Sequence, residues 1–527
     1  MVNLSKKLLI ESIFLISLGA TTSLSLPPFN YFLINFFTFS LLFIFLFKKL
    51  NSQKVKKIFF FYGWLFGFGY FVSNLYWISI SLTFDENFKF LIPFTIFFIP
   101  GLLSIFYGLA FYIFILLNVR KVTNSFLIFS LLFAIFEFIR GSILTGFPWN
   151  LIAYSFLEQL EIIAITSLIG TYGFNLFCIS LFSCPALLIL KETNKDIGVF
   201  MFFILCLSIF YLYGDHYKKK FYTENEIIYD YKIRAIGSSI SLDRFYSSNN
   251  PVSVIKELIE ISDPNFDEKT IFIWPEGILP NVSQKELIEY KWLFKNRFNQ
   301  NHILALGINK HVEDGGFKKY FNTFSIYDYE LNLINSYSKI NLVPFGEYLP
   351  FENFFSEIGL KSLTNNYQSY SKGNKRDIIK IKKNDFSLKL LPLICYEIIY
   401  SGEIYKNDDF DIIINISEDG WFGKSIGPRQ HFAHSIFRSI ESGKYVIRSA
   451  NNGISAIINP VGEIEKSLEL NDNGFIDFIL EKKIQPTVFS RFGNTIFGLL
   501  ILLYIFLLFS INFSFSISRN KSNFKNK

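Results

Sequence analysis

Three apolar segments in the second half of the chain each end in a residue that can take part in chemistry. Ile271-Phe-Ile-Trp-Pro-Glu276 ends in a carboxylate, Tyr337-Ser-Lys339 in an amine, and Leu390-Leu-Pro-Leu-Ile-Cys395 in a thiol. In open α/β sheets, functional sites gather beyond the carboxyl ends of the strands. We therefore expect Glu276, Lys339 and Cys395 to lie together.

Cys395 allows two interpretations. The other three cysteines lie in long apolar runs, so Cys395 has no partner for an intramolecular disulfide in the polar part of the chain. A free cysteine is among the most buried residue types, so a small core residue is the simpler interpretation. A nucleophile needs a base and a cation nearby to form and hold its thiolate. Glu276 and Lys339 would supply both, which favours the nucleophile.

The residue types assign a role to each member of this triad. Cys395 is the nucleophile, and its position at the end of a strand exposes the sulfur. Glu276 is the general base for the thiol and then the acid for the departing oxygen. Lys339 is a fixed positive charge that lowers the pKa of the thiol and stabilises the tetrahedral oxyanion.

The composition predicts a membrane protein. Of 527 residues, 51% are hydrophobic and 19% are aromatic, and the mean hydropathy is +0.32. A membrane helix needs about 20 mainly apolar residues. The first candidate has a basic flank but no small-x-small cleavage site, which predicts an uncleaved anchor. We expect eight transmembrane helices, near residues 8–26, 29–47, 58–80, 90–117, 125–140, 162–190, 197–213 and 496–515.

The formal charge of +7 is concentrated in alternate connections between these segments. Cations cluster near residues 6–7, 48–57, 120–121, 191–195 and 519–527, and the other short loops have almost none. The positive-inside rule then places both termini in the cytoplasm. A nucleic-acid-binding surface would need the cations on one folded face, so we expect no nucleic-acid partner.

Three regions follow from this topology. Residues 1–213 hold seven transmembrane helices, residues 214–488 form a periplasmic catalytic domain, and residues 489–527 hold the last helix and a cytoplasmic tail. Short apolar runs alternate with polar helical segments within 214–488, which is typical of a layered α/β domain. Residues 361–385 are expected to form a mobile loop. The expected strands lie at 231–236, 270–274, 303–308, 321–327, 333–337, 387–394, 411–416, 445–448 and 454–458, and the expected helices at 251–261, 284–298 and 429–442.

The motifs around the triad resemble a known family. Trp-Pro-Glu276, Lys339 with Val-Pro-Phe-Gly-Glu347-Tyr-Leu-Pro, and Cys395-Tyr-Glu resemble the Glu–Lys–Cys signature of the nitrilase or carbon–nitrogen hydrolase superfamily. Further motifs are similar to its membrane branch, the apolipoprotein N-acyltransferase family. These are Asn74-x-x-Trp77, Gly146-Phe-Pro-Trp149, Asp419-Gly-Trp-Phe-Gly423, Gly427-Pro-Arg-Gln-His431 and Arg448-Ser-Ala-Asn-Asn-Gly-Ile-Ser455.

The resemblance implies an α-β-β-α sandwich carried by a membrane domain of the bacterial inner membrane. It implies an N-acyltransferase that moves a fatty acyl chain from a membrane phospholipid, through a cysteine thioester, to the α-amino group of a diacylglyceryl-cysteine on an apolipoprotein. A monomer without cofactor is expected. His431 and His434 have no cysteine or carboxylate ligand pattern beside them, so we expect no metal.

The resemblance also implies supporting residues. Glu347 is a second carboxylate that holds Lys339 and orients the incoming amine, and a structural ion pair is the equal alternative. Tyr396 and Glu397 are interpreted as supports of the nucleophile, with simple packing as the alternative for Tyr396.

Substrate contacts are expected at Phe245, Trp149 and Trp421. The sequence also departs from the family pattern. Phe245 stands where a Trp is usual, and Ile236-Gly-Ser-Ser239 replaces the Gln-Gly-Asn type of start. Gly277 replaces Ala, and Glu418 replaces Asn.

Other functions stay open at this point. The aromatic residues of 73–77 and 145–155 fit either an interfacial belt or a lipid-binding rim. A membrane-anchored amidase could use the same triad with water as the acceptor. A transporter or receptor would show internal repeats or charges within spans, and the sequence has no detectable repeat and only Glu11 and Glu137 as such charges.

Overall fold

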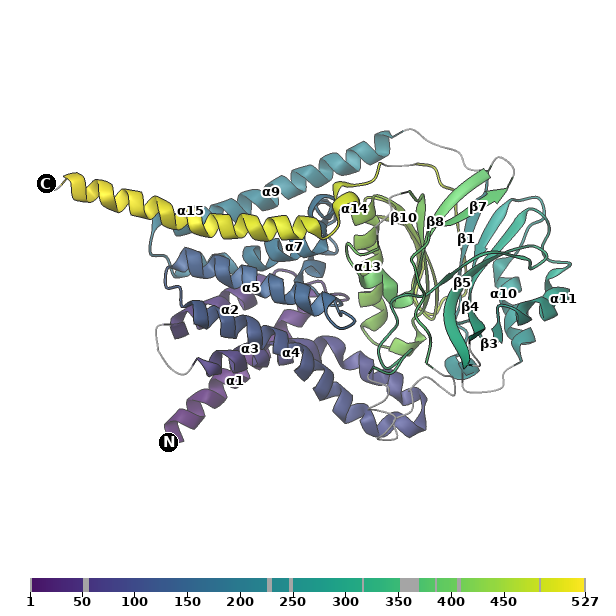
Figure 1. Cartoon of the computed structure of the whole chain (residues 1–527), viewed down its shortest axis with the longest axis horizontal. Coiled ribbons are helices and arrows are strands. Elements are labelled where there is room, and N and C mark those ends of the chain that lie inside the picture. Colours follow the sequence, from purple (N-terminus) through teal and green to yellow (C-terminus); the bar gives the residue numbers. More distant parts are fainter. Residues whose placement is uncertain are drawn as a thin grey trace.

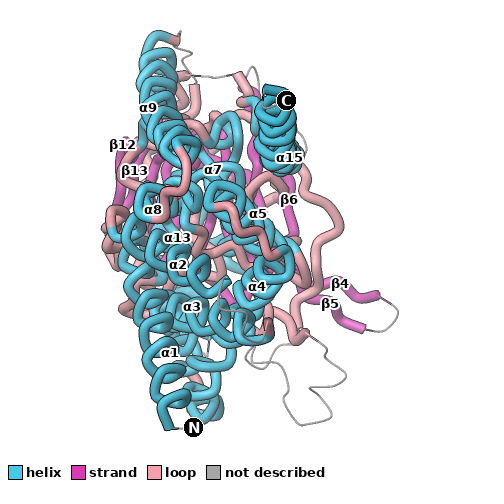
Figure 2. Tube along the Cα trace, turned by 90° about the vertical axis from the view of Figure 1, so that its left-hand side faces the viewer, coloured by secondary structure: helices cyan, strands magenta, loops and turns pink. Residues whose placement is uncertain are grey.

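The chain has a bundle of apolar helices joined to a layered α/β domain (Figure 1). The structure, a computed structural model, describes residues 2–50, 56–224, 230–245, 250–314, 317–350, 369–383, 386–404, 409–482 and 485–525. Both termini lie at the end of the helical part that points away from the sheets (Figure 1). In Figure 2 the helices stand in front of the strands, and the ends of β4 and β5 project beyond them.

The helical part is a multi-span membrane domain. Six segments of the described residues are long and apolar enough to cross a membrane. They are formed by α1 (Val2–Thr22) with η1 (Ser23–Ser25), α3 (Lys57–Leu75) with η2 (Tyr76–Phe84), η3 (Glu86–Leu91) with α4 (Ile92–Leu117), α5 (Val122–Ser142), α7 (Thr166–Ser183) with α8 (Pro185–Ile189), and α9 (Asn194–Thr223).

The predicted count of eight spans is not confirmed. The second expected span is α2 (Ile34–Leu50), which has 17 residues. The last expected span is α15 (Thr495–Lys525). Its apolar part, Thr495–Ser510, is shorter than the six segments that are long enough to cross a membrane. Helix α9 continues to Thr223. The predicted boundary at residue 213 between the membrane part and the next domain falls inside this helix, and it stays a prediction.

Small residues allow α3 and α4 to pack closely. A Cβ atom added at Gly63 would lie 2.2 Å from the carbonyl oxygen of Tyr107, and one at Gly67 would lie 3.2 Å from the Cα of Ser104. Gly63 and Gly67 are four residues apart and lie on one helix face, as in the small-residue interfaces common between membrane helices.

Two sheets form the α/β domain. The first has the order β13-β1-β2-β4-β5-β6, with β3 paired to β4, and the second has the order β12-β11-β10-β9-β8-β7. The strands of the first sheet are β1 (Lys232–Gly237), β2 (Thr270–Ile273), β3 (Leu279–Ser283), β4 (His302–Asp314), β5 (Phe317–Asp328), β6 (Leu333–Ser338) and β13 (Gly474–Phe478). Those of the second are β7 (Ile379–Lys383), β8 (Phe386–Ile394), β9 (Ile412–Glu418), β10 (Tyr445–Asn451), β11 (Ser455–Ile458) and β12 (Ile464–Leu468).

Alternation along the strands builds the layers. Ile271 and Ile273 of β2 enter the core between the two sheets, whereas Phe272 and Trp274 enter the core under the outer helices, because successive side chains of a strand point to opposite faces. The outer helices of the first sheet are α10 (Pro251–Ser262) and α11 (Lys291–Phe294). Helix α13 (Gly427–Ser442) covers the second sheet, between it and the membrane helices (Figure 1). The predicted α-β-β-α sandwich is confirmed.

Some predicted elements are wrong in detail. The helix expected at 284–298 is only a 3-10 segment, η6 (Glu286–Tyr290), followed by the short α11. The loop expected at 361–385 contains strand β7, and its residues 361–368 and 384–385 lie outside the described residues. Strands β3, β7, β12 and β13 were not predicted. In β7 and β12 exposed charged residues interrupt the apolar pattern on which the prediction relied.

Helix α13 also joins the sandwich to the membrane helices. One apolar cluster contains Phe432 and Phe437 of α13, the outer face of the second sheet and the membrane helices. Helix α7 is broken at Gly170, where φ is +68°. The carboxylate of Glu441 accepts hydrogen bonds there from the backbone N–H of Thr171 at 2.7 Å and from its hydroxyl at 2.6 Å. The α/β domain therefore caps a broken membrane helix, which fixes the two parts against each other.

Candidate active site

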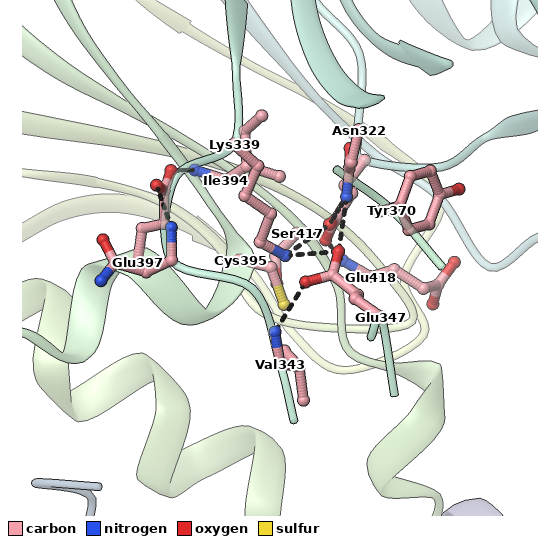
Figure 3. Close-up of polar contacts among 12 residues, drawn as sticks. Asn322, Lys339, Val343, Glu347, Tyr370, Ile394, Cys395, Glu397, Ser417 and Glu418 are labelled. Atoms are coloured by element: carbon pink, nitrogen blue, oxygen red, sulfur yellow. Dashed lines mark hydrogen bonds and ion pairs between the residues drawn. The ribbon is translucent and has the colours of Figure 1, made fainter. Parts of the chain in front are cut away.

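The structure brings the predicted triad together at the ends of three strands. Glu276 follows β2, Lys339 follows β6, and Cys395 follows β8, so the site lies between the two sheets. Lys339 Nζ is 3.2 Å from Glu276 Oε1. In Figure 3 the sulfur of Cys395 and the amine of Lys339 point into the same space. Lys339 is almost completely buried, whereas Cys395 keeps part of its surface open.

Two carboxylates share the Lys339 ammonium. Glu347 Oε1 lies 2.9 Å from Nζ. Asn322 of β5 donates to both carboxylates, at 2.7 Å to Glu276 and 2.9 Å to Glu347. Asn322 therefore spaces two like charges that would otherwise repel. The sequence analysis missed it, because a single Asn within a strand carries no signal of its own in the sequence.

Backbone donors hold the other carboxylate oxygens. Glu276 Oε2 accepts from the N–H of Glu418 at 3.1 Å, and Glu418 ends strand β9 of the second sheet. Glu347 Oε2 accepts from the N–H of Val343 at 2.9 Å. Both carboxylates are thus oriented from two sides, so their positions relative to Lys339 do not depend on the ammonium alone.

Cys395 has an unusual backbone conformation. Its φ is +49°, in the left-handed region that non-glycine residues rarely adopt. Such strain costs about 1–3 kcal/mol and persists only where the surroundings over-determine it. The chain leaves β8 sharply at this residue and enters the 3-10 segment η7 (Cys395–Ile399). The strained turn presents the sulfur at the strand end.

Burial dominates the electrostatics of Cys395. It raises the pKa of the Cys395 thiol well above its ordinary value, the Glu276 carboxylate adds to the rise, and the Lys339 ammonium opposes it. Cys395 is therefore a thiol at neutral pH. Lys339 lowers the pKa of the thiol, as the sequence analysis expects, but burial outweighs it.

Lys339 stays charged in the site. Burial alone would lower its pKa, but the Glu276 and Glu347 carboxylates outweigh burial and hold the pKa well above its ordinary value. Burial raises the pKa of Glu347, against the attraction of Lys339. The site thus combines a fixed cation with a carboxylate that gains a proton more easily than usual.

Glu397 connects the Cys395 turn with the segment that carries Lys339. Its Oε2 accepts from the N–H of Ile394 at 2.9 Å. Its Oε1 accepts from four donors in or near the other segment, namely the Tyr337 hydroxyl at 2.6 Å, Ile340 N at 2.9 Å, Asn341 N at 3.2 Å and Arg376 Nη2 at 3.1 Å. Glu397 is fully buried. We therefore interpret it as a positioning residue.

Tyr396 contacts the membrane part. Its hydroxyl donates to the carbonyl of Gly146 at 3.0 Å, and the Tyr400 hydroxyl donates to the carbonyl of Thr145 at 2.8 Å. The residue after Cys395 is thus bonded to a loop between membrane helices. Among the described residues, His, Cys, Asp and Glu form no group of three that could hold a metal ion.

Comparisons with known proteins agree with this architecture. Residues 18–184 match the family model described as the apolipoprotein N-acyltransferase N-terminal domain, and residues 273–481 match the carbon–nitrogen hydrolase model. The apolipoprotein N-acyltransferase of Rickettsia prowazekii is 34% identical over 484 residues, which cover 90% of this chain and 93% of that protein. That of Rhodopseudomonas palustris is 30% identical and covers 93% of each chain. The chain belongs to the apolipoprotein N-acyltransferase family. It is accordingly a membrane enzyme, an acyltransferase.

Solved structures of the nitrilase superfamily align with the catalytic part. Nit3 of Saccharomyces cerevisiae has 17% sequence identity and a TM-score of 0.34, and the alignment covers 49% of this chain and 93% of that chain. An amidase of Nesterenkonia has 13% identity and a TM-score of 0.31, with 48% and 90% coverage.

Two departures from the apolipoprotein N-acyltransferase pattern are linked through Arg244. Glu418 is buried and forms an ion pair with the Arg244 guanidinium, and it also accepts from Asn451 Nδ2 at 2.7 Å. Arg244 Cζ lies 4.6 Å from the centre of the Phe245 ring. The charge of Glu418 is thus compensated by Arg244, the residue next to Phe245.

The predicted substrate contacts fall into two groups. Phe245 and Trp421 are half-buried and pack at 5.1 Å between ring centres, and Trp421 also contacts Phe84 of the membrane part. Trp149 is only 2% exposed, and its indole donates to Gln430 Oε1 at 2.9 Å. Trp149 therefore joins the membrane part to α13 and presents little surface to a substrate.

Proposed function

We propose that this protein transfers a fatty acyl chain from a membrane phospholipid to the α-amino group of the diacylglyceryl-cysteine of apolipoproteins. The observation that carries the proposal is the meeting of Lys339, Glu276 and the Cys395 turn in a domain packed on membrane helices. Family membership supports the acceptor. The catalytic residues are Glu276, Lys339 and Cys395.

The first step forms a thioester. The sulfur of Cys395 attacks the carbonyl carbon of the phospholipid ester while Glu276 takes the thiol proton. The carbonyl oxygen becomes an oxyanion, which the Lys339 ammonium stabilises. The intermediate collapses, the carbon–oxygen bond of the ester breaks, and Glu276 returns the proton to the departing alkoxide. The products are an S-acyl enzyme and a lysophospholipid.

The raised pKa of Cys395 determines when the proton moves. A thiol that is protonated at rest must lose its proton during the attack, so Glu276 acts as a base in that step and the thiolate is not preformed. A buried neutral thiol is also less exposed to alkylation and oxidation than a free thiolate.

The second step forms the amide. The α-amino nitrogen of the acceptor attacks the thioester carbon, and a carboxylate of the site takes the amine proton. The carbon–sulfur bond then breaks, and the carboxylate passes that proton to the departing sulfur, which restores the Cys395 thiol. Glu347 is close to Lys339 and has a raised pKa, which suits a group that receives a proton. We assign it the roles of holding Lys339 and orienting the amine.

The domain and membrane assignments are part of the proposal. Residues 1–213 and 489–527 form the membrane part of the bacterial inner membrane, and residues 214–488 form a periplasmic catalytic domain. The alternating cations support this orientation, as does the position of both termini at the far end from the sheets (Figure 1). The protein acts as a monomer, without nucleic-acid partners.

The test supplies the purified enzyme with phospholipid vesicles and a synthetic diacylglyceryl peptide that has a free N-terminus. The proposal expects the peptide to gain one acyl group as an amide, with one lysophospholipid formed for each transfer. A blocked N-terminus is the control and should stop amide formation. Release of free fatty acid without peptide acylation would instead identify a membrane-anchored hydrolase and overturn the proposal.

A further inference from the structure

An ion pair is buried inside the membrane part, near the C-terminal end of α5. It joins Glu137 to Arg140, about one helical turn later, and neither side chain has any exposed surface. The Tyr107 hydroxyl of α4 donates to the other oxygen of Glu137. Charged side chains within membrane spans are costly and often mark a functional site. The catalytic scheme above uses none of these residues.

Arg140 uses its second terminal nitrogen on the loop that follows α5. Its Nη1 donates to the carbonyl of Phe147 and lies 3.4 Å from Asn150 Oδ1. The Arg140 carbonyl in turn accepts from the N–H of Phe147 at 3.0 Å. The guanidinium also lies 5.2 Å from the centre of the Phe71 ring. A single residue therefore holds both backbone groups of Phe147.

The same loop holds the residue that follows Cys395. Gly146 directly precedes Phe147 in this loop, and its carbonyl accepts from the Tyr396 hydroxyl at 3.0 Å. The Tyr396 ring also stacks on the Phe147 ring, at 6.4 Å between ring centres. The place at which Tyr396 contacts the membrane part therefore depends on how Arg140 holds the loop.

The ion pair does not by itself explain the packing of the helices. Glu137 and Arg140 belong to one helix, so their mutual attraction joins no two elements. Replacing a buried ion pair by apolar residues of similar volume is often neutral or stabilising. An apolar pair, however, could not donate to the Phe147 carbonyl. The carboxylate therefore compensates a cation whose second nitrogen is used on the loop.

We propose that Arg140, compensated by Glu137, is a positioning residue for the reaction of Cys395. It fixes the Phe147 backbone and thereby keeps the adjacent carbonyl in place for the Tyr396 hydroxyl. The proposal rests on the proposed role of Cys395 as the nucleophile. The Cys395 backbone is strained, with φ at +49°, and such a conformation persists only where its surroundings hold it. Without the Arg140 donor the loop shifts, the turn relaxes and the sulfur loses its direction.

A second ion pair of the membrane part offers a matched control. Lys49 of α2 pairs with Glu11 of α1, and both side chains are mostly buried. The Tyr62 hydroxyl of α3 donates to Glu11 at 2.6 Å, which repeats the arrangement around Glu137. The cations at 48–57 mark the predicted cytoplasmic side of the membrane, opposite to the catalytic domain. Replacing this second pair therefore tests the loss of a buried ion pair far from the nucleophile.

The experiment follows S-acylation of the full-length protein in detergent at several phospholipid concentrations, beside a thermal melt. Intact mass is recorded over time for wild type, E137Q/R140M, R140K and the control E11Q/K49M. Each double variant removes one positive and one negative charge together, so neither leaves a buried charge without its partner. R140K retains the charge opposite Glu137 and carries the test if E137Q/R140M does not fold.

We expect E137Q/R140M to lower the maximal rate of acylation by about fivefold or more, a barrier increase of about 1 kcal/mol. The half-saturating phospholipid concentration should stay unchanged, because the lost contact holds the enzyme and not the lipid. R140K has one nitrogen in place of two, so it cannot reproduce the forked contact. It should slow the reaction similarly while it melts within a few degrees of wild type. E11Q/K49M should acylate at the wild-type rate.

Tyr396→Phe tests the route by which Arg140 acts. It removes the hydroxyl that donates to the Gly146 carbonyl, so it should slow acylation to a similar extent. Residues that act through one contact are not additive. In the Y396F background, E137Q/R140M should therefore slow acylation by less than about twofold further.

Each outcome bears on a separate claim. A wild-type rate in E137Q/R140M or R140K, or equal slowing in E11Q/K49M, overturns the positioning role. Undiminished further slowing in the Y396F background overturns it too, because Arg140 would then act by another route. A lower final acylated fraction with an unchanged rate constant shows that the pair serves folding alone and likewise overturns it. If wild type itself gains no acyl group, the proposed function fails, independently of Arg140.

Discussion

Removing one hydrogen bond at Glu397 should slow acylation while most of the fold is retained. In Glu397→Gln the amide oxygen can keep the Oε1 position, where four donors converge. The amide nitrogen then replaces Oε2 and faces the N–H of Ile394, which Oε2 accepts at 2.9 Å in the native site. One charge-assisted bond is lost and two donors face each other beside Cys395. Hydrogen bonds to charged groups contribute about 1.5–3 kcal/mol.

The alternative truncation, Glu397→Ala, should be far more severe. It removes the acceptor of the Tyr337 hydroxyl and of the Ile340 and Asn341 N–H groups as well as the partner of Arg376, and each buried donor left unsatisfied costs about 1–3 kcal/mol. The Gln variant therefore separates positioning from folding. If the whole of the lost hydrogen bond, about 1.5–3 kcal/mol, is added to the barrier of acylation, the rate of acylation in E397Q falls by about 10- to 150-fold.

The assay is the time course of S-acylation by phospholipid, read by intact mass, beside a thermal melt in the same detergent. We expect E397Q to melt within a few degrees of wild type and to acylate slowly, and E397A to melt much earlier. An E397Q enzyme that acylates at the wild-type rate would refute the idea that Glu397 aligns Cys395.

Three further predictions concern the charges around the site. Lys339→Met should lower the acylation rate by a factor of about 100–1,000, because one oxyanion stabiliser is lost; a fall of less than tenfold in single-turnover assays would contradict this role. Alkylation of Cys395 by iodoacetamide should be slow at pH 7, because burial and Glu276 raise the pKa of the thiol. The alkylation rate should keep rising with pH above the range in which ordinary thiols titrate. An alkylation rate that is already constant below pH 7 would instead show a preformed thiolate. Glu441→Gln leaves buried Arg438 with a weaker partner and weakens the hydrogen bond to the Thr171 N–H. The thermal midpoint of unfolding should therefore fall, whereas the acylation rate of the folded enzyme should stay unchanged. An unchanged midpoint would count against the proposed coupling of the two parts.

The strand ends were predictable because the sequence marks them strongly. Apolar runs of β-branched and aromatic residues stop abruptly at Glu276, Lys339 and Cys395. The ends after β2 and β6 belong to the first sheet and the end after β8 to the second, and they meet between the two sheets; residue type and position at a strand end together indicated a site. The resemblance to the family implied the sandwich, and the alternation of strands and helices by itself predicted a layered α/β domain. These features depend on local patterns, which a single sequence contains.

The rest depends on contacts between distant segments. Asn322 enters the site from β5, and its residue type in its local sequence does not point to Cys395. Trp149 was expected to contact substrate, but its position is determined by Gln430, 281 residues away. The pKa of Cys395 depends on how deeply the site is buried, which spacing along the chain does not reveal.

The most direct test of the central claim is intact-protein mass spectrometry after incubation with phospholipid alone. The account predicts a mass increase of one acyl chain on the wild-type protein, removed by hydroxylamine and absent in Cys395→Ala. A Cys395→Ala protein that still gained the acyl group, or a wild-type adduct that resisted hydroxylamine, would contradict a thioester on Cys395.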